Sequence, residues 1–119
     1  MITIRIKDLR LRTYVGFNDE EQKKRQDVVI NVTFRYLADE AAQSDDVRFA
    51  VNYRTITKEI IERVEGGRFL LLERLAVEVL DLVMADERIL EAEVEVDKPH
   101  ALRFSDSVSA AVSARRGVA

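Results

Sequence analysis

The strand pattern that leads to Lys98 makes it the residue of this sequence best suited to do chemistry. Residues 91–97 alternate acidic and apolar side chains without a break, which is typical of a β-strand with one wet and one dry face. Lys98 has the parity of the apolar residues, and Pro99 ends the strand. Burial lowers the pKa of an amine toward the range useful for proton transfer. Lys98 is therefore a candidate acid/base group, unless its chain extends back to water.

Glu21 and Tyr53 are two further polar candidates. Glu21 lies in the highly charged stretch 18–26, for which a solvated turn is the simpler interpretation. Tyr53 follows Asn52, a residue type that caps helix N-termini, so Tyr53 is expected in the first turn of a helix. A tyrosine in that position most often contributes to packing.

Glu73 follows three leucines at the predicted start of another helix. A carboxylate in a first turn gains roughly 0.3–1 kcal/mol from the helix dipole, which is a sufficient structural reason for it. A carboxylate beside free helix N–H groups and walled by leucines also suits a flat heterocycle with two adjacent N–H donors. A 2-amino-4-oxopyrimidine ring presents such a pair, and a carboxylate binds it through two charge-assisted hydrogen bonds.

The elements that must position these residues follow from hydrophobic periodicity. Two amphipathic stripes predict helices, and Gly66-Gly67 ends the first of them. Alternating stretches predict four β-strands. The strands cover residues 2–14, 28–37, 91–98 and 108–114; the stripes are Ile56, Ile60, Ile61 and Val64, then Leu72, Leu75, Ala76, Val79, Leu80 and Val83. The order ββααββ predicts a single α+β domain, residues 1–119, with two helices on one face of an antiparallel four-stranded sheet.

The other face of this sheet is expected to be polar, with Arg5 and Lys7 on the first strand and the acidic residues of 91–97 on the third. One interpretation is a solvated face, which antiparallel sheets commonly have. The other is the interior of a ring of subunits, because ring closure would also remove both open sheet edges. The residues alone favour neither the solvated face nor the ring interior.

Composition excludes several classes of protein. The 119 residues are 47% hydrophobic and 34% charged, with a net charge of −3, which suits a globular domain and gives no basic footprint for nucleic acid or anionic membrane. There is no cysteine and one histidine, so disulfides and thiolate or histidine-rich metal sites are excluded. No apolar run reads as a signal peptide or membrane span, and we expect a cytoplasmic protein.

Taken together, these residues resemble the dihydroneopterin aldolase family over nearly the whole chain. The resemblance implies the tunnelling fold, in which sheets of neighbouring subunits join into a barrel and two tetramer rings stack as a homo-octamer. This favours the ring interpretation of the polar face. Its motifs lie at residues 4–14, 25–33, Asn52-Tyr53-Arg54-Thr55, Leu71-Leu72-Glu73, 97–103 and 106–109.

The resemblance also implies roles for the candidate residues. Lys98 is expected as the main acid/base group, and Glu21 is expected to position Lys98 or a water. Tyr53 is expected to reach the site from a neighbouring subunit and to orient or relay a proton of the side-chain hydroxyl. Three residues are expected to bind a pterin substrate: Glu73, the backbone near Leu72, and Gln26.

Two departures from the aldolase pattern favour a different activity within the family. Thr13-Tyr14-Val15-Gly16 stands where aldolases carry a Gly-Tyr-His-Gly-like stretch, and residues 99–103 replace their proline-rich loop. We therefore expect epimerisation at C2′ of a dihydroneopterin triphosphate, with aldolase activity or a non-catalytic pterin-binding ring as alternatives. Arg103 and His100 are expected to bind the triphosphate; residues 23–25 are further candidates or a solvated loop.

No cofactor and no metal are expected, because a dihydropterin carries a C=N bond beside its side chain that can itself accept electrons. The partners expected are the dihydropterin and further copies of the chain, without nucleic acid or membrane.

Overall fold

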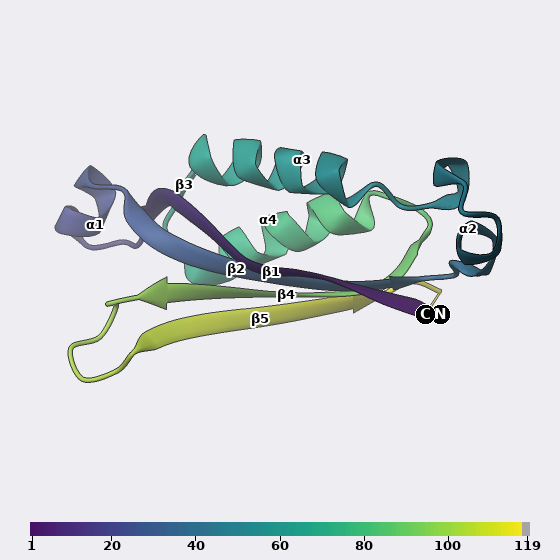
Figure 1. Ribbon diagram of the computed structural model, residues 1–119. Helices are drawn as coiled ribbons and strands as arrows, with labels where there is room; N and C mark the ends of the chain where they lie inside the picture. The colour runs from purple at the N-terminus through teal and green to yellow at the C-terminus, as the bar shows by residue number, and fades with distance from the viewer. Residues whose placement is uncertain (118–119) are drawn as a thin grey trace.

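A sheet with two long helices on one face forms the body of the molecule (Figure 1). The computed structural model describes residues 1–117. Helices α3 and α4 cover one face, while α1 and α2 lie at opposite ends (Figure 1). In chain order the elements are β1 (Ile2–Val15), α1 (Asp19–Lys23), β2 (Gln26–Tyr36), α2 (Asp39–Ser44), a 3₁₀ turn (Val47–Phe49), α3 (Tyr53–Glu65), β3 (Arg68–Phe69), α4 (Leu72–Met84), β4 (Ile89–Pro99) and β5 (Ser107–Arg115).

The strand order in the sheet is β3-β1-β2-β4-β5. The four long strands are antiparallel neighbours, as the periodicity predicts, so the expected α+β fold with two helices on one face is confirmed. The fifth strand, β3, was not predicted. It has two residues, which is too short for a periodic signal, and it pairs in parallel with Tyr14 and Val15 at the end of β1.

A β-bulge near Asp8 changes the facing pattern of β1. The register shifts between Ile6 and Leu9, and Asp8 adopts a left-handed conformation with φ 52°. Its N–H donates to the side-chain oxygen of Asn31 at 2.9 Å. Because of the extra residue, even-numbered side chains point at the helices before the bulge and odd-numbered side chains do so after it.

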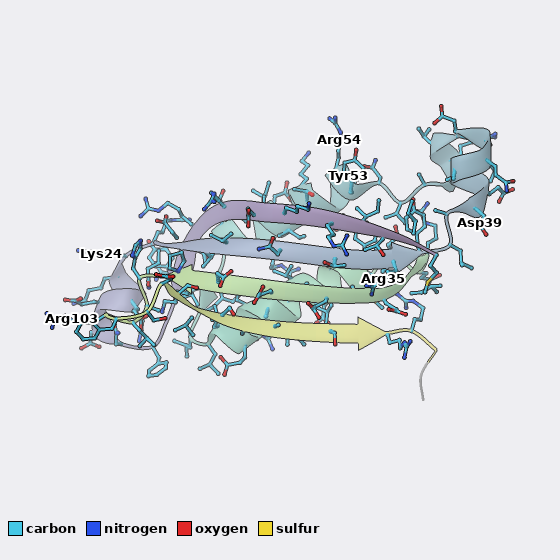
Figure 2. All side chains as sticks on the ribbon, turned by 60° about the horizontal axis from the view of Figure 1, so that its bottom comes forward. Lys24, Arg35, Asp39, Tyr53, Arg54 and Arg103 are labelled. Atoms are coloured by element: carbon cyan, nitrogen blue, oxygen red, sulfur yellow. The ribbon has the colours of Figure 1, made fainter. Side chains whose placement is uncertain are left out.

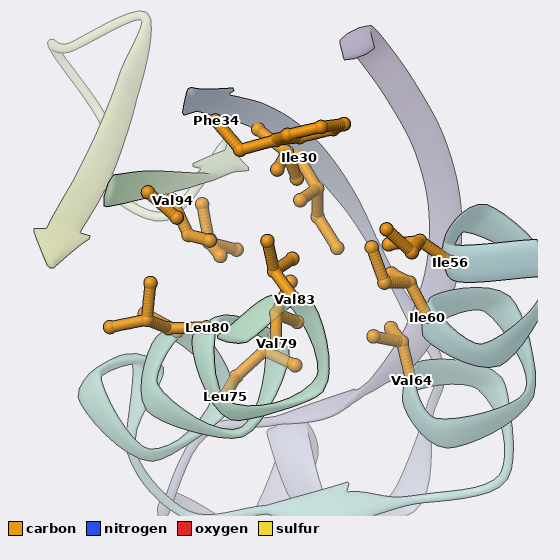
Figure 3. Packing of buried hydrophobic residues seen from close by; sticks show 14 of the residues in the cluster. Ile30, Phe34, Ile56, Ile60, Val64, Leu75, Val79, Leu80, Val83 and Val94 are labelled. Atoms are coloured by element: carbon orange, nitrogen blue, oxygen red, sulfur yellow. The ribbon is translucent and has the colours of Figure 1, made fainter. Parts of the chain in front are cut away.

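The core lies between the sheet and the two long helices (Figure 3). From the helices it contains residues of the two predicted stripes, and from β2 and β4 it contains the predicted alternate residues. The inward residues of β5 are only half-buried, because β5 is an edge strand. Side chains labelled in Figure 3 include Ile30, Phe34, Ile60, Val64, Leu75, Val79, Val83 and Val94.

The opposite face of the sheet is polar, as predicted. Across it Glu91 pairs with Arg35 at 3.1 Å and with Arg115 at 3.5 Å, and Ser109 donates to Glu95 at 3.0 Å. Opposite charges on neighbouring strands stabilise such pairs. Within residues 1–117, no helix has both the length and the apolar character needed to cross a membrane.

Candidate active site at one end of the sheet

Strand pairing brings several of the predicted residues to one end of the sheet. Gln26 begins β2 opposite Thr13, and Lys98 lies at the end of β4, opposite Val108. The junction between β3 and α4 lies beside the end of β1, since Phe69 pairs with Val15. Segments far apart in the sequence therefore meet around the ends of β1 and β4.

Lys98 is one of two polar or charged residues that the described chain, residues 1–117, buries; the other is Thr13. Lys98 is 9% exposed, which confirms that it points to the dry side of β4. Its Nζ donates to the carboxylate of Glu21 and forms an ion pair with it. Because the partner is negatively charged and close, the ammonium remains compensated although it has lost most of its water.

Glu21 belongs to α1, the short helix between β1 and β2, and it has two roles there. Its N–H donates to the side-chain oxygen of the N-cap Asn18 at 2.8 Å, and its carboxylate accepts from the Asn18 N–H at 3.4 Å, which forms a capping box. The hydrogen bond from Lys98 holds the pKa of the Glu21 carboxyl below its ordinary value, and the capping contacts act in the same direction. Glu21 is therefore ionised at neutral pH and aimed at Lys98.

Gly16 allows the Glu21 side chain to reach Lys98. Its φ of 136° lies in a region that L-residues rarely adopt, and its N–H donates to the Phe69 carbonyl at 2.9 Å. A Cβ on Gly16 would overlap the carboxyl group of Glu21. The glycine thus leaves the space through which the carboxylate passes.

Glu73 and Gln26 lie at the same end of the sheet, Glu73 on α4 and Gln26 on β2. Glu73 is exposed in the first turn of α4. Leu71, which precedes that helix, provides no side-chain cap, so the N–H groups of the first turn, beginning at Leu72, stay available to an acceptor. Gln26 donates its side-chain N–H to the Val15 carbonyl at 2.8 Å, which fixes the amide and leaves its oxygen as an acceptor.

Tyr53 is not brought to this region within one chain. It begins α3 and is 51% exposed. A helix of 13 residues is about 20 Å long, and the other end of α3 contacts the Lys98 end of the sheet, where Thr13 donates to the Val64 carbonyl at 2.5 Å. Figure 2 shows Tyr53 far from Lys24 and Arg103. A contact between Tyr53 and Lys98 thus requires a second copy.

His100 and Arg103 lie in the exposed loop after Lys98. His100, with φ 63°, lines a hollow of about 340 Å³ together with Arg10 and Arg12 of β1. Sequence reasoning missed these arginines; their alternation with Leu9 and Leu11 is the signal that could have placed them on the polar face. The Arg103 guanidinium lies 5.5 Å from the ring centroid of Phe104, and Arg103 does not line that hollow.

The chain is similar to known proteins over almost its full length. The family model "FolB: Dihydroneopterin aldolase" matches residues 4–113. The dihydroneopterin triphosphate 2′-epimerase of Pseudomonas aeruginosa is 55% identical over 98% of this chain and 94% of its own. The dihydroneopterin aldolase of Haemophilus influenzae is 32% identical over 87% of each chain.

A solved structure shows the same fold. The dihydroneopterin aldolase of Escherichia coli, crystallised in complex with neopterin, aligns with a TM-score of 0.90 at 31% identity, over 96% of this chain and 99% of that one. The chain belongs to the dihydroneopterin aldolase family.

Proposed function

We propose that the protein inverts C2′ of 7,8-dihydroneopterin 3′-triphosphate and forms the dihydromonapterin triphosphate. The observation that carries the proposal is the Lys98–Glu21 pair, shielded from water beside the open first turn of α4. The higher identity to a 2′-epimerase than to an aldolase, 55% against 32%, supports this choice within the family.

The pterin ring binds through its amino-pyrimidine edge. Glu73 accepts two hydrogen bonds from adjacent N–H groups of the ring, and backbone N–H groups near Leu72 donate to the oxygen atom of the ring. The Gln26 side-chain amide donates to the Val15 carbonyl, and its oxygen is left to accept a hydrogen bond from the substrate. The exposed side chains of Leu70 and Leu71 supply apolar contact area for a flat ring.

The chemical step is a reversible retro-aldol cleavage. Lys98, oriented by Glu21, assists removal of the proton of the 2′ hydroxyl. The O–H electrons form the C2′=O bond, the C1′–C2′ bond breaks, and its electrons move into a C6=C1′ bond. N5 takes up one proton for the one that the hydroxyl releases, so the Lys98–Glu21 pair ends the step in its starting protonation state. If the aldehyde turns its other face to C1′ before the C1′–C2′ bond re-forms, the product has the inverted configuration at C2′. The C=N bond of the dihydropterin serves as the electron acceptor.

Tyr53 completes the site from a neighbouring copy in a ring and relays or orients the hydroxyl proton. The edges of the sheet suit such a ring, since β5 forms one edge and most of β1 forms the other. Edge strands with unpaired backbone groups readily pair with another chain. We propose two stacked tetramer rings, a homo-octamer whose polar sheet face lines the interior.

The triphosphate is held by cations after Lys98, with Arg103 and His100 as the first candidates and Arg10 and Arg12 beside His100. Guanidinium groups bind phosphate oxygens in pairs. Arg103→Ala should weaken binding of the triphosphate substrate more than that of unphosphorylated dihydroneopterin. An equal effect on both substrates would remove Arg103 from phosphate binding.

The proposal is tested by chiral chromatography of the products formed from the triphosphate. Inversion at C2′ without loss of the side chain is expected. Accumulation of 6-hydroxymethyl-7,8-dihydropterin with released aldehyde would identify an aldolase instead. Binding of the pterin without any product would identify a non-catalytic ring protein.

A further inference from the structure

Helix α1 carries Glu21 and has little packing of its own. It has five residues, and none of them is buried. Beside it lies a hollow of about 200 Å³, lined by Gln22 of α1 and by Tyr14, Arg68 and Leu70 of the neighbouring segments. Because apolar contact does not fix this helix, its position depends on a few polar contacts.

Arg68 of β3 makes one of these polar contacts across the hollow. Its Nη1 donates to the backbone carbonyl of Gln22 at 3.1 Å. Its guanidinium lies 3.9 Å from the centroid of the Tyr14 ring, and Tyr14 is also its partner in the β1–β3 ladder. The aromatic face holds the guanidinium in one orientation, and the ladder fixes its backbone to the strand that ends at Gly16.

The bond to Gln22 acts on the residue next to Glu21. Gln22 is held at a second point as well, since its side-chain amide donates to the Phe17 carbonyl at 2.9 Å. Together these contacts fix α1 near its end, while the Asn18 capping box fixes its start. An α1 free to move would carry the Glu21 carboxylate away from Lys98.

We propose that Arg68 is a positioning residue, which holds α1 through Gln22 and so keeps Glu21 paired with Lys98. The proposal rests on the proposed function, because it assigns Arg68 to the geometry of that site. Within residues 1–117, Arg68 forms no hydrogen bond and no ion pair with Lys98 or Glu21. Its effect on turnover should therefore pass entirely through Glu21.

The first test compares Arg68→Met with Arg68→Lys. Methionine retains an apolar stem over Tyr14 but cannot donate to Gln22, whereas lysine can donate to that carbonyl. We expect Arg68→Met to lower kcat about ten- to a hundredfold, since small displacements of catalytic groups have effects of this size. Arg68→Lys should recover part of the loss. Arg63→Met removes an exposed arginine that links α3 to Glu78, and it should leave kcat unchanged.

A double-mutant cycle separates positioning from a general structural effect. In a Glu21→Gln background, Arg68→Met should cause no further loss of kcat, because the group that it positions is already neutral. The same fold loss in both backgrounds would overturn the proposal. Full activity of Glu21→Gln alone would instead contradict the role of the Lys98–Glu21 pair, so the two failures are distinguishable.

Discussion

At the residue scale, the Lys98–Glu21 pair balances two opposing effects. Removing an ammonium group from water costs several kcal/mol, and a close carboxylate offsets this cost only if it is held in place. Here the capping box of α1 holds the carboxylate, and Gly16 clears its path. The proposed catalytic pair therefore depends on Asn18 and Gly16, which have no expected contact with substrate.

Gly16→Ala should lower activity by displacing Glu21. Its Cβ would occupy the space of the Glu21 carboxyl group, and φ 136° adds strain of about 1–3 kcal/mol for a residue with a side chain. Steady-state kinetics should show a loss at least as large as that of Glu21→Gln. Gly117→Ala is the matched control, with φ 80° and open space around it. Equal activity of both variants would show that Gly16 does not control Glu21.

The pH dependence of stability should report the same pair. The pKa of Glu21 is lowered in the folded protein from 4.5, so its stabilising effect is complete above about pH 4.5 and is lost as the pH falls through the folded pKa. Wild type should have a higher thermal unfolding midpoint than Glu21→Gln at pH 7, and the gap should narrow below pH 4.5. A gap that is constant down to pH 3 would contradict the lowered pKa.

Strand parity was sufficient to predict the burial of Lys98, because a period of two fixes the facing of every residue in a regular strand. It could not predict the partner. Glu21 lies 77 positions away, in a charged stretch that resembles any solvated turn, and only the family resemblance linked the two. Arg68 gave no signal at all, since its role depends on the ladder that β3 forms with Tyr14.

At the element scale, the junction of β1 with α3 positions the active end. Thr13 is fully buried and donates to the carbonyl of Val64 near the end of α3. The bulge at Asp8 brings Thr13 to the helix side. The sequence predicted a continuous strand over residues 2–14 but not this bulge, because the change of parity after Ile6 is masked by the polar run at 7–8.

Thr13→Val should destabilise the fold by about 1–3 kcal/mol, since it leaves a buried helix carbonyl without its hydroxyl donor. Chemical denaturation of the variant against wild type measures the change. Thr33→Val, on the polar face of β2, removes a hydroxyl outside the core and should have a small effect. A small effect at Thr13 too would show that the Gly67 N–H, which donates to the same carbonyl at 3.3 Å, satisfies it without the hydroxyl.

At the scale of the whole molecule, the chain is too elongated for Tyr53 and Lys98 to meet within one copy. It measures 52 × 28 × 24 Å, with Lys98 and Tyr53 toward opposite ends. The sequence predicted the two helices and four strands of each copy, because their periodicity is local. The proposed arrangement of copies would depend on sheet edges and on exposed groups such as Phe104, which is 96% exposed, and neither produces a periodic pattern in the sequence.

A shared site predicts complementation between two inactive variants. Tyr53→Ala and Lys98→Ala, refolded together, should regain up to about a quarter of wild-type activity, because in a random ring one site in four draws both intact residues from neighbouring copies. Each variant refolded alone should stay inactive. Continued inactivity of a mixture that is shown by mass spectrometry to contain mixed rings would mean that Tyr53 and Lys98 do not share a site between copies.

The central claim is that Lys98 carries the proton transfer in inversion at C2′. The most direct test is the initial rate at which Lys98→Ala converts dihydroneopterin triphosphate into its C2′ epimer, followed by chiral chromatography beside wild type. We expect nearly complete loss of inversion in a protein whose assembly, measured by light scattering, matches that of wild type. Inversion at the wild-type rate would contradict the assignment of Lys98.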